Sequence, residues 1–208
     1  MHRLRVPLRR RLGAAPLVAA LSISIGACGS ATPAPPRATV TPTSPTPAAL
    51  TQFQASTFTV TVPRGWIDRT SDGQAAASIN AAAGTLQMLL MAPQTGANVS
   101  NEHIDVTTVA QPVPDDQLAS YLQSVGQNGA TSVTTPQPFN LDGATGLFVT
   151  YNLTASASPP AQAPVLMVED MLVNHGGQTY EIVLNTAQAD FPSQTSALQE
   201  VLASWHWH

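Results

Sequence analysis

Alternating hydrophobic and polar residues predict most of the secondary structure in the C-terminal three quarters of this chain. The segment 57–62 alternates cleanly, which places three hydrophobic side chains on one face of a half-buried strand. Apolar runs or alternation predict further strands at 85–91, 104–109, 145–153, 165–173 and 179–185, and a less regular one at 132–139. The Gly176-Gly177 pair supplies positive φ between the last two strands and predicts a hairpin.

Two segments have helical rather than strand periodicity. Residues 114–125 place Leu118, Leu122 and Val125 on one stripe, and residues 190–204 carry a second stripe that ends at Trp205. A proline- and alanine-rich loop is predicted at 156–163. Runs of strands with one middle and one terminal helix predict an α+β fold, in which helices flank a mostly antiparallel sheet.

The N-terminus has the pattern of an export signal. The uncharged stretch from Leu12 to Ala27 spans 16 residues and follows an arginine-rich start. A membrane-spanning helix needs about 20 residues, so the stretch fits the apolar region of a signal peptide. Small residues at Gly26 and Ala27, directly before Cys28, resemble the lipobox of bacterial lipoproteins. That resemblance implies acylation of Cys28 and cleavage between Ala27 and Cys28.

Two other interpretations of this segment remain open: an ordinary secretory signal with an incidental cysteine, and an uncleaved short anchor. Under the lipoprotein interpretation the chain divides into a signal peptide at 1–27, a lipidated cysteine and stalk at 28–56, and a folded domain at 57–208. The stalk is rich in proline, threonine and alanine, a composition that favours extended polyproline II over a packed core.

Charge excludes one class of partner. The chain has 8 basic residues, all of them arginine, and five precede Cys28, whereas all 12 acidic residues follow it. The chain from Cys28 onward therefore carries 3 − 12 = −9. Nucleic-acid binding needs clustered cations, so no nucleic-acid partner is expected. With no lysine, this chain cannot use a lysine Schiff base, and a single cysteine forms no intramolecular disulfide.

One short motif resembles a known family. The string from Phe58 to Trp66 matches F-x-V-x-x-P-x-G-W, the opening of Mog1/PsbP-like domains, through Pro63, Gly65 and Trp66. The layout of signal, stalk and domain is similar to the LpqN/LpqT lipoproteins of actinobacteria. The resemblance implies an α/β/α sandwich around an antiparallel sheet and non-enzymatic adaptor or accessory roles, and it supplies no catalytic residues. The motif also has a structural interpretation, as a strand end, a tight turn and a cap on the core.

Glu169 and Asp170 interrupt an otherwise apolar strand and are candidate binding residues. At least one of them must face inward or lie at an interface, and a buried carboxylate is costly unless it is paired. Arg64 or Arg69 is the predicted partner. A strand with one polar face, or a sheet edge protected by charge, is the alternative explanation.

Metal binding has weak support in the sequence. The candidates are Glu102, His103, Asp105 and His175, but HExxH is absent and no pair of cysteines is present. In the terminal segment 205–208 two tryptophans alternate with two histidines, which favours an anchored tail with solvated histidines over a weak copper or nickel site. No metal and no cofactor is therefore expected.

The sequence predicts a non-enzymatic binding or accessory module, held on the extracytoplasmic face of the cell membrane by acylated Cys28. Its expected partners are the lipid bilayer and an envelope protein. The alternative is a carrier of a lipid or other apolar ligand, with a cavity lined by Met88, Met91, Met167 and Met171. A hydrolase is the weakest hypothesis, because no Gly-x-Ser-x-Gly motif is present.

Overall fold

The computed structural model describes residues 50–79, 84–93, 102–125, 129–154 and 165–208. The predicted signal peptide, Cys28, most of the stalk and the predicted loop at 156–163 lie outside the described residues. None of the described helices is long and apolar enough to cross a membrane.

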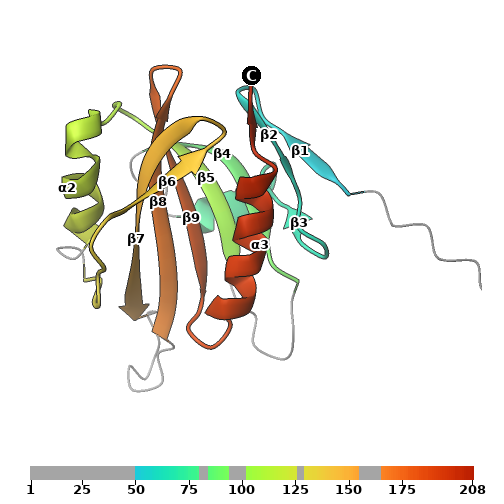
Figure 1. Cartoon of the computed structure of the whole chain (residues 1–208). Helices are drawn as coiled ribbons and strands as arrows, with labels where there is room; N and C mark the ends of the chain where they lie inside the picture. The colour runs from blue at the N-terminus through green and yellow to red at the C-terminus, as the bar shows by residue number, and fades with distance from the viewer. Residues whose placement is uncertain (1–49, 80–83, 94–101, 126–128, 155–164) are drawn as a thin grey trace, which may run out of the picture. The chain divides into compact units, whose positions relative to one another are not determined.

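The fold is built on two antiparallel sheets (Figure 1). The larger sheet has seven strands, in the spatial order β3 (Ile67–Asp68), β4 (Gly84–Met91), β5 (His103–Val109), β9 (Gln178–Ala187), β8 (Val165–His175), β7 (Ala144–Thr154) and β6 (Gln137–Leu141). The smaller sheet has three, in the order β1 (Gln52–Gln54), β2 (Phe58–Thr61) and β10 (His206–Trp207). The helices are α1 (Gly73–Ser78), the 3-10 turn η1 (Asp115–Gln117), α2 (Leu118–Gln123) and α3 (Phe191–Ala203).

These elements confirm the predicted α+β class and its mostly antiparallel sheet. The strand expected at 132–139 forms only as β6, from Gln137 to Leu141, and Ser132 has a positive φ of 56°, outside the extended region. The helix expected at 114–125 is divided into η1 and α2. Strands β1, β3 and β10 and helix α1 were not predicted. Because β1 lies within 28–56 and pairs with β2, the folded region begins ahead of residue 57.

One face of the seven-stranded sheet packs against α3 and the smaller sheet. Helix α3 contacts both β9 and β2, and Figure 1 shows it beside β9. The hydrophobic core on this face contains Phe58, Val60, Met88, Leu90, Ile104, Val106, Met171, Val173, Ile182, Leu184, Leu198 and Val201, among others. Both sheets and the last helix therefore share one core.

The opposite face packs against α2. In a strand successive side chains point to opposite sides, so Leu172 faces away from its neighbours Met171 and Val173. Leu172 belongs to a second core, together with Leu118 and Leu122 of α2 and residues of β7 and β8. This second core is smaller and also includes Val109 of β5 and Val183 of β9.

The C-terminus closes the first core. The ring of Trp205 stacks on Phe58 with 4.2 Å between ring centroids, and Trp207 lies edge-on to Phe58 at 6.2 Å. The Trp207 indole Nε1 donates to the carbonyl oxygen of Leu141 at 3.0 Å. Both tryptophans are buried and both terminal histidines are exposed, which confirms the predicted anchored tail.

Candidate functional site

The family-like motif forms a tight turn. The Trp66 amide donates to the Pro63 carbonyl at 3.0 Å, and Gly65 has φ +83°, a conformation that glycine adopts without steric cost. The Trp66 side chain is buried in the first core. In this structure Pro63 and Gly65 lie in a tight turn and Trp66 lies in the core.

A shallow groove runs beside this turn, with a volume of about 340 Å³. We call it the motif groove; its walls are Leu50, Thr51 and the segment 62–68. Leu50 is 66% exposed and Ile67 is 51% exposed, and the other large hydrophobic side chain of comparable exposure among the described residues is Val165 at 40%. Exposed apolar side chains gathered at one groove are typical of an interaction surface.

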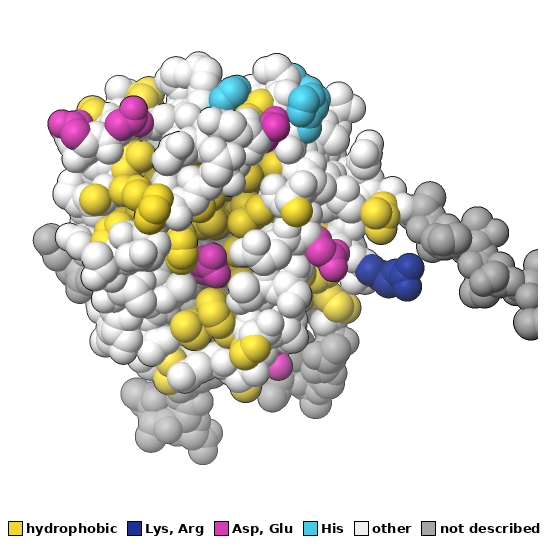
Figure 2. All heavy atoms as spheres, in the orientation of Figure 1, with side chains coloured by type: hydrophobic (Ala, Val, Ile, Leu, Met, Phe, Trp, Pro, Cys, Tyr) yellow, Lys and Arg dark blue, Asp and Glu magenta, His cyan; other side chains and the backbone are white. Residues whose placement is uncertain are grey.

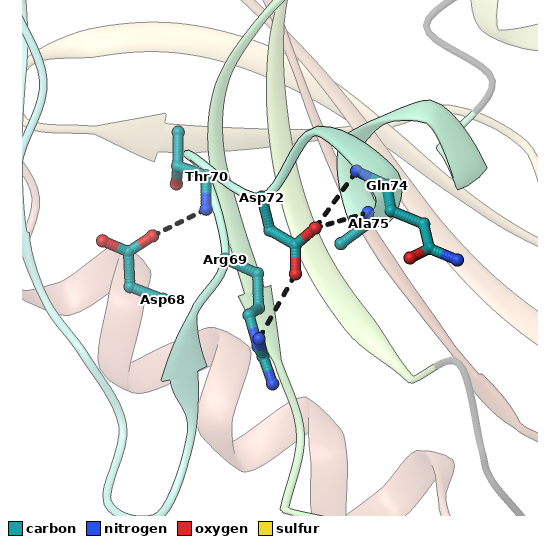
Figure 3. Close-up of polar contacts among 6 residues, drawn as sticks. All are labelled: Asp68, Arg69, Thr70, Asp72, Gln74 and Ala75. Carbon is teal, nitrogen blue, oxygen red and sulfur yellow. Dashed lines mark hydrogen bonds and ion pairs between the residues drawn. The ribbon is translucent and has the colours of Figure 1, made fainter.

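Both arginines of the described residues lie at or next to the motif groove. Arg64 is part of the groove wall, Arg69 directly follows the wall segment in sequence, and Figure 2 shows one dark-blue group at the edge of the visible face. The Arg69 guanidinium contacts the Asp72 carboxylate at 3.2 Å, and Asp72 Oδ1 accepts hydrogen bonds from the Gln74 and Ala75 amides at 3.1 Å (Figure 3). The hydrogen bond from the Ala75 amide lowers the pKa of Asp72, and the Gln74 amide and the Arg69 guanidinium lower it by smaller amounts. Arg69 is thus held at the N-terminus of α1.

These contacts correct the predicted pairing of arginines with the β8 carboxylates. Arg69 is paired with Asp72, and no hydrogen bond or ion pair joins Arg64 or Arg69 to Glu169 or Asp170 among the described residues. Glu169 and Asp170 are both buried, and because they are consecutive in β8 they face opposite sides of the sheet. Burial raises the pKa of Glu169.

Asp170 is part of a group of carboxylates on the α2 side of the sheet. Antiparallel register places Asp105 of β5 and Asp170 of β8 on either side of Val183 of β9. Glu181 lies two residues from Val183 and shares its face. We call Asp105, Asp170 and Glu181 the carboxylate cluster.

The carboxylate cluster has few hydrogen-bond donors to compensate for its burial. The Tyr151 hydroxyl donates to Asp170 Oδ2 at 3.4 Å, but Asp170 Oδ1 is buried and finds no hydrogen-bond partner among the described residues. The Thr107 hydroxyl contacts Glu181 Oε2 at 3.5 Å, and His103 Nε2 lies 3.3 Å from Asp105 Oδ1.

Burial and mutual repulsion shift the titration of the cluster. Burial raises the pKa of Asp170 well above its ordinary 3.8, and the Glu181 carboxylate raises it further. Burial and then the Asp105 carboxylate raise the pKa of Glu181. The pKa of the Tyr151 hydroxyl is raised by burial and by the Asp170 carboxylate. The cluster therefore favours either bound protons or an external cation.

A second groove, with a volume of about 460 Å³, lies beside α2. We call it the α2 groove; it is lined by residues 111–114 and by Gln117, Ser120, Tyr121 and Ser124. The pKa of Tyr121 is raised by burial and then by the charges of Glu181 and Asp170. One wall of the α2 groove is thus a tyrosine within electrostatic reach of the carboxylate cluster.

Hydrogen bonds fix the segment 111–114 over the end of β8 and β9. The Val113 amide donates to the Thr179 hydroxyl at 2.8 Å, and the Asn174 side-chain amide donates to the Val113 carbonyl at 2.9 Å. Both Thr179 and Asn174 share the sheet face of Glu181. The α2 groove and the carboxylate cluster therefore lie on the same side of the sheet.

Of the residues considered for metal binding, His103 and Asp105 lie in contact, whereas Glu102 and His175 have other partners. Glu102 accepts from the Ala187 amide at 3.2 Å and from the Gln194 side chain at 2.9 Å. The His175 ring stacks on Trp207 at 4.2 Å between centroids. Within the described part of the chain, no three His, Cys, Asp or Glu side chains are placed to hold a metal ion.

The methionines proposed for a carrier cavity do not line either groove. Met88 and Met171 are buried in the first core, and Met91 and Met167 are half-buried in β4 and β8.

Comparison with known proteins supports the fold. No protein-family model matches the sequence, and no curated protein is significantly similar to it. Among solved structures, LpqN, which is involved in cell-envelope biogenesis of Mycobacterium tuberculosis, aligns with a TM-score of 0.53 and 10% identity, covering 76% of this chain and 90% of LpqN.

Two further structures are similar. The cyanobacterial PsbP of Synechocystis sp. PCC 6803 aligns with a TM-score of 0.47 and 14% identity over 77% of this chain and 94% of its own. The Ran-binding protein Mog1p of Saccharomyces cerevisiae aligns with a TM-score of 0.46 and 17% identity over 76% and 96%. Both TM-scores are lower than that of the LpqN alignment, and at 10% identity the likeness to LpqN extends to the fold alone.

Proposed function

We propose that this protein is a cell-envelope lipoprotein, anchored on the extracytoplasmic face of the cell membrane by acylated Cys28. In this proposal its Mog1/PsbP-like domain is a non-enzymatic binding or accessory module for an envelope protein. The lipobox-like sequence before Cys28, the proline-rich stalk and the similarity in fold to LpqN support it.

The motif groove is the observation that carries the binding function. Leu50 and Ile67 are largely exposed beside the only arginines of the described residues, Arg64 and Arg69. A patch that combines exposed apolar side chains with arginine suits a protein partner, because exposed apolar patches mark interaction sites and arginine is enriched at protein interfaces.

A carrier of an apolar ligand is the second candidate. The volume of the motif groove, about 340 Å³, lies within the range of small-molecule sites, and its inner wall includes Val62 and Trp66. The exposed positions of Leu50 and Ile67 favour contact with a partner surface over enclosure of a ligand.

Membrane anchoring is tested by Cys28→Ala in the native envelope. We expect the variant to leave the membrane fraction, because it has no thiol to acylate, whereas a Ser30→Ala control stays in that fraction. Immunoblotting of fractionated cells measures both. Retention of Cys28→Ala in the membrane would mean that the N-terminal segment itself is the anchor.

Partner binding is tested by crosslinking the full lipoprotein in its own envelope. Ile67→Asp places a charge in the motif groove and should abolish the crosslinked product. Val165→Asp places the same charge at an exposed hydrophobic residue outside the groove and should leave the product unchanged. Equal crosslinking of Ile67→Asp and the parent would contradict the assignment. An organic-extractable mass bound to the purified protein in native mass spectrometry would favour the carrier.

A further inference from the structure

The C-terminal segment presents two exposed histidines in extended backbone. His206 lies in β10 and His208 follows directly after it, so the two side chains point to the same side. The sequence leaves open whether this segment is extended, and the structure shows that it is. His206 pairs with Thr59 of β2, and the His208 amide donates to the Thr57 carbonyl at 3.0 Å. Pairing with β2 therefore fixes the backbone of both histidines.

The residue between the two histidines holds them against the domain. The Trp207 side chain is buried in the first core, and its backbone amide donates to Asp142 Oδ2 at 2.9 Å. A backbone that is already ordered leaves only side-chain freedom to be lost when two histidines bind one ligand. The pair is therefore preorganised, unlike two histidines in a free chain end.

Each imidazole has one nitrogen in contact with the protein. His206 Nδ1 lies 3.2 Å from Asp142 Oδ2, and His208 Nε2 lies 2.8 Å from the Thr59 hydroxyl oxygen. A carboxylate that accepts from one ring nitrogen fixes the ring orientation and leaves the lone pair on the other nitrogen, as around metal-bound histidines. Nε2 of His206 and Nδ1 of His208 are therefore the candidate ligand atoms.

The separation of the two rings suits a shared ion. An imidazole nitrogen binds Zn²⁺ at about 2.0–2.1 Å, so the ring centroids of two imidazoles on one ion lie roughly 5–6 Å apart. The centroids of His206 and His208 are 6.0 Å apart. The His206 side chain is 72% exposed, which leaves room for an ion and for water around it.

We propose that His206 and His208 form a surface site for a divalent transition-metal ion of the Ni²⁺, Cu²⁺ and Zn²⁺ type, the ions that imidazole nitrogen suits. Water completes the coordination, because two imidazoles are fewer than the ligands such an ion takes. Asp142 is a positioning residue, which orients His206 through Nδ1.

A second contact between a histidine and a carboxylate is less suited to an ion from solution. The side chains of His103 and Asp105 are only 12% and 5% exposed. The proposed metal site shares no residue with the walls of the motif groove, and it does not depend on membrane anchoring. It therefore stands or fails independently of the proposed adaptor function.

The experiment is calorimetric titration of the full-length chain, purified in a non-ionic detergent, with Ni²⁺. Every sample carries His2→Ala and Cys28→Ala, which remove the histidine and the thiol that lie outside the described residues. This protein is the parent for the variants below. We expect saturable binding of Ni²⁺ and no comparable binding of Mg²⁺, because Mg²⁺ prefers oxygen ligands.

Variants locate the ion. His206→Ala and His208→Ala should each weaken Ni²⁺ binding by about tenfold or more, because the second imidazole binds the ion intramolecularly and that advantage is lost. His103→Gln is the matched control: it removes a histidine that also contacts an aspartate and should leave the affinity unchanged. Circular dichroism establishes that each variant is folded.

A separate variant tests the positioning residue. Asp142→Asn keeps an acceptor for the Trp207 amide and tolerates the positive φ of 45° at this position. It should weaken Ni²⁺ binding by about tenfold without changing the midpoint of urea denaturation. Unchanged Ni²⁺ affinity would overturn the part assigned to Asp142.

The inference is overturned if Ni²⁺ does not bind the parent saturably, or if Mg²⁺ binds equally well; neither result depends on a variant. Equal loss of affinity in His103→Gln and His206→Ala would also overturn it, because the ion would then not be specific to the C-terminal histidines. Unchanged affinity in His208→Ala would reduce the site to one histidine and overturn the shared ion. None of these results affects the crosslinking test of the motif groove.

Discussion

The two faces of the seven-stranded sheet are filled in different ways. The face under α3 is covered by a continuous hydrophobic core that reaches the smaller sheet and the C-terminal tryptophans. The face under α2 has a smaller core, and it also carries three buried or half-buried carboxylates on β5, β8 and β9. The same strands contribute to both faces through alternate residues.

This difference separates stability from function. A buried hydrophobic side chain stabilises the folded state, whereas a desolvated carboxylate without a full set of donors destabilises it. Residues that reduce stability persist where they serve binding or catalysis, because function and stability often conflict at such sites. The α3 face therefore provides the stability on which a costly α2 face depends.

The largest expected effect is on the α3 face. Phe58 is fully buried and stacks on Trp205, so Phe58→Ala should lower the free energy of unfolding by about 3–5 kcal/mol, measured by urea denaturation. Phe53, half-buried at the rim, is the matched control, and Phe53→Ala should cost less. If Phe58→Ala lowered the free energy of unfolding less than Phe53→Ala does, the main core would not lie on this face.

The next effect concerns α2. This six-residue helix is too short to be stable alone, and buried Leu118 and Leu122 hold it on the sheet. Leu122→Ala should cost about 2–3 kcal/mol and increase hydrogen exchange of the α2 amides more than that of β8 or β9. Gln123→Ala alters the same helix at an exposed position and should change neither quantity. If Leu122→Ala accelerated hydrogen exchange equally in α2, β8 and β9, the core under α2 would not be a separate unit.

Most of the fold was predictable because hydrophobic periodicity is a local property. The strands at β4, β5 and β7 to β9 and the helix α3 follow directly from it. Strands β1, β3 and β10 have only two or three residues each. Strand β10, at the C-terminal end of the chain, forms its hydrogen bonds with β2, which lies far away in the sequence. Pairing over that distance leaves no periodic signal.

The carboxylate cluster was only partly predictable. Asp170 was recognised as a polar interruption of an apolar strand, but it was assigned an arginine partner. Glu181 was missed, although a carboxylate between Tyr180 and Ile182 is the same kind of signal. The cluster forms because β5, β9 and β8 are neighbours in space, and that order is not encoded in any local pattern.

On the α2 face we expect a smaller change in the free energy of unfolding, and here the substitution should stabilise the protein. Asp170→Asn should raise the free energy of unfolding by about 1–3 kcal/mol at pH 7.5, because it removes a desolvated charge with an unsatisfied oxygen. The raised pKa of Asp170 means that its folded form binds the proton more tightly than its unfolded form. Its stabilising contribution is present in full below the ordinary pKa of 3.8 and is lost as pH rises through the folded-state pKa.

The difference between Asp170→Asn and the parent should therefore grow as pH rises above about 4, since asparagine does not titrate. Urea denaturation at several pH values between 4 and 8 measures it. A variant that is less stable than the parent throughout this range would show that Asp170 contributes to stability, and would remove the contrast between the two faces.

The smallest change in the free energy of unfolding is expected from Glu169→Gln, which compares the two faces of the sheet at neighbouring residues of one strand. Glu169 lies next to Asp170 but faces the α3 side, and burial alone raises its pKa, with no second carboxylate beside it. The sign is the same as for Asp170: stability is lost as pH rises through the folded-state pKa, so Glu169→Gln should also be more stable at pH 7.5. Its gain should be smaller than that of Asp170→Asn, because it relieves desolvation without relieving repulsion. If the two gains were equal in denaturation experiments at the same pH, mutual repulsion within the carboxylate cluster would contribute nothing, and burial would be the only cost that distinguishes the α2 face.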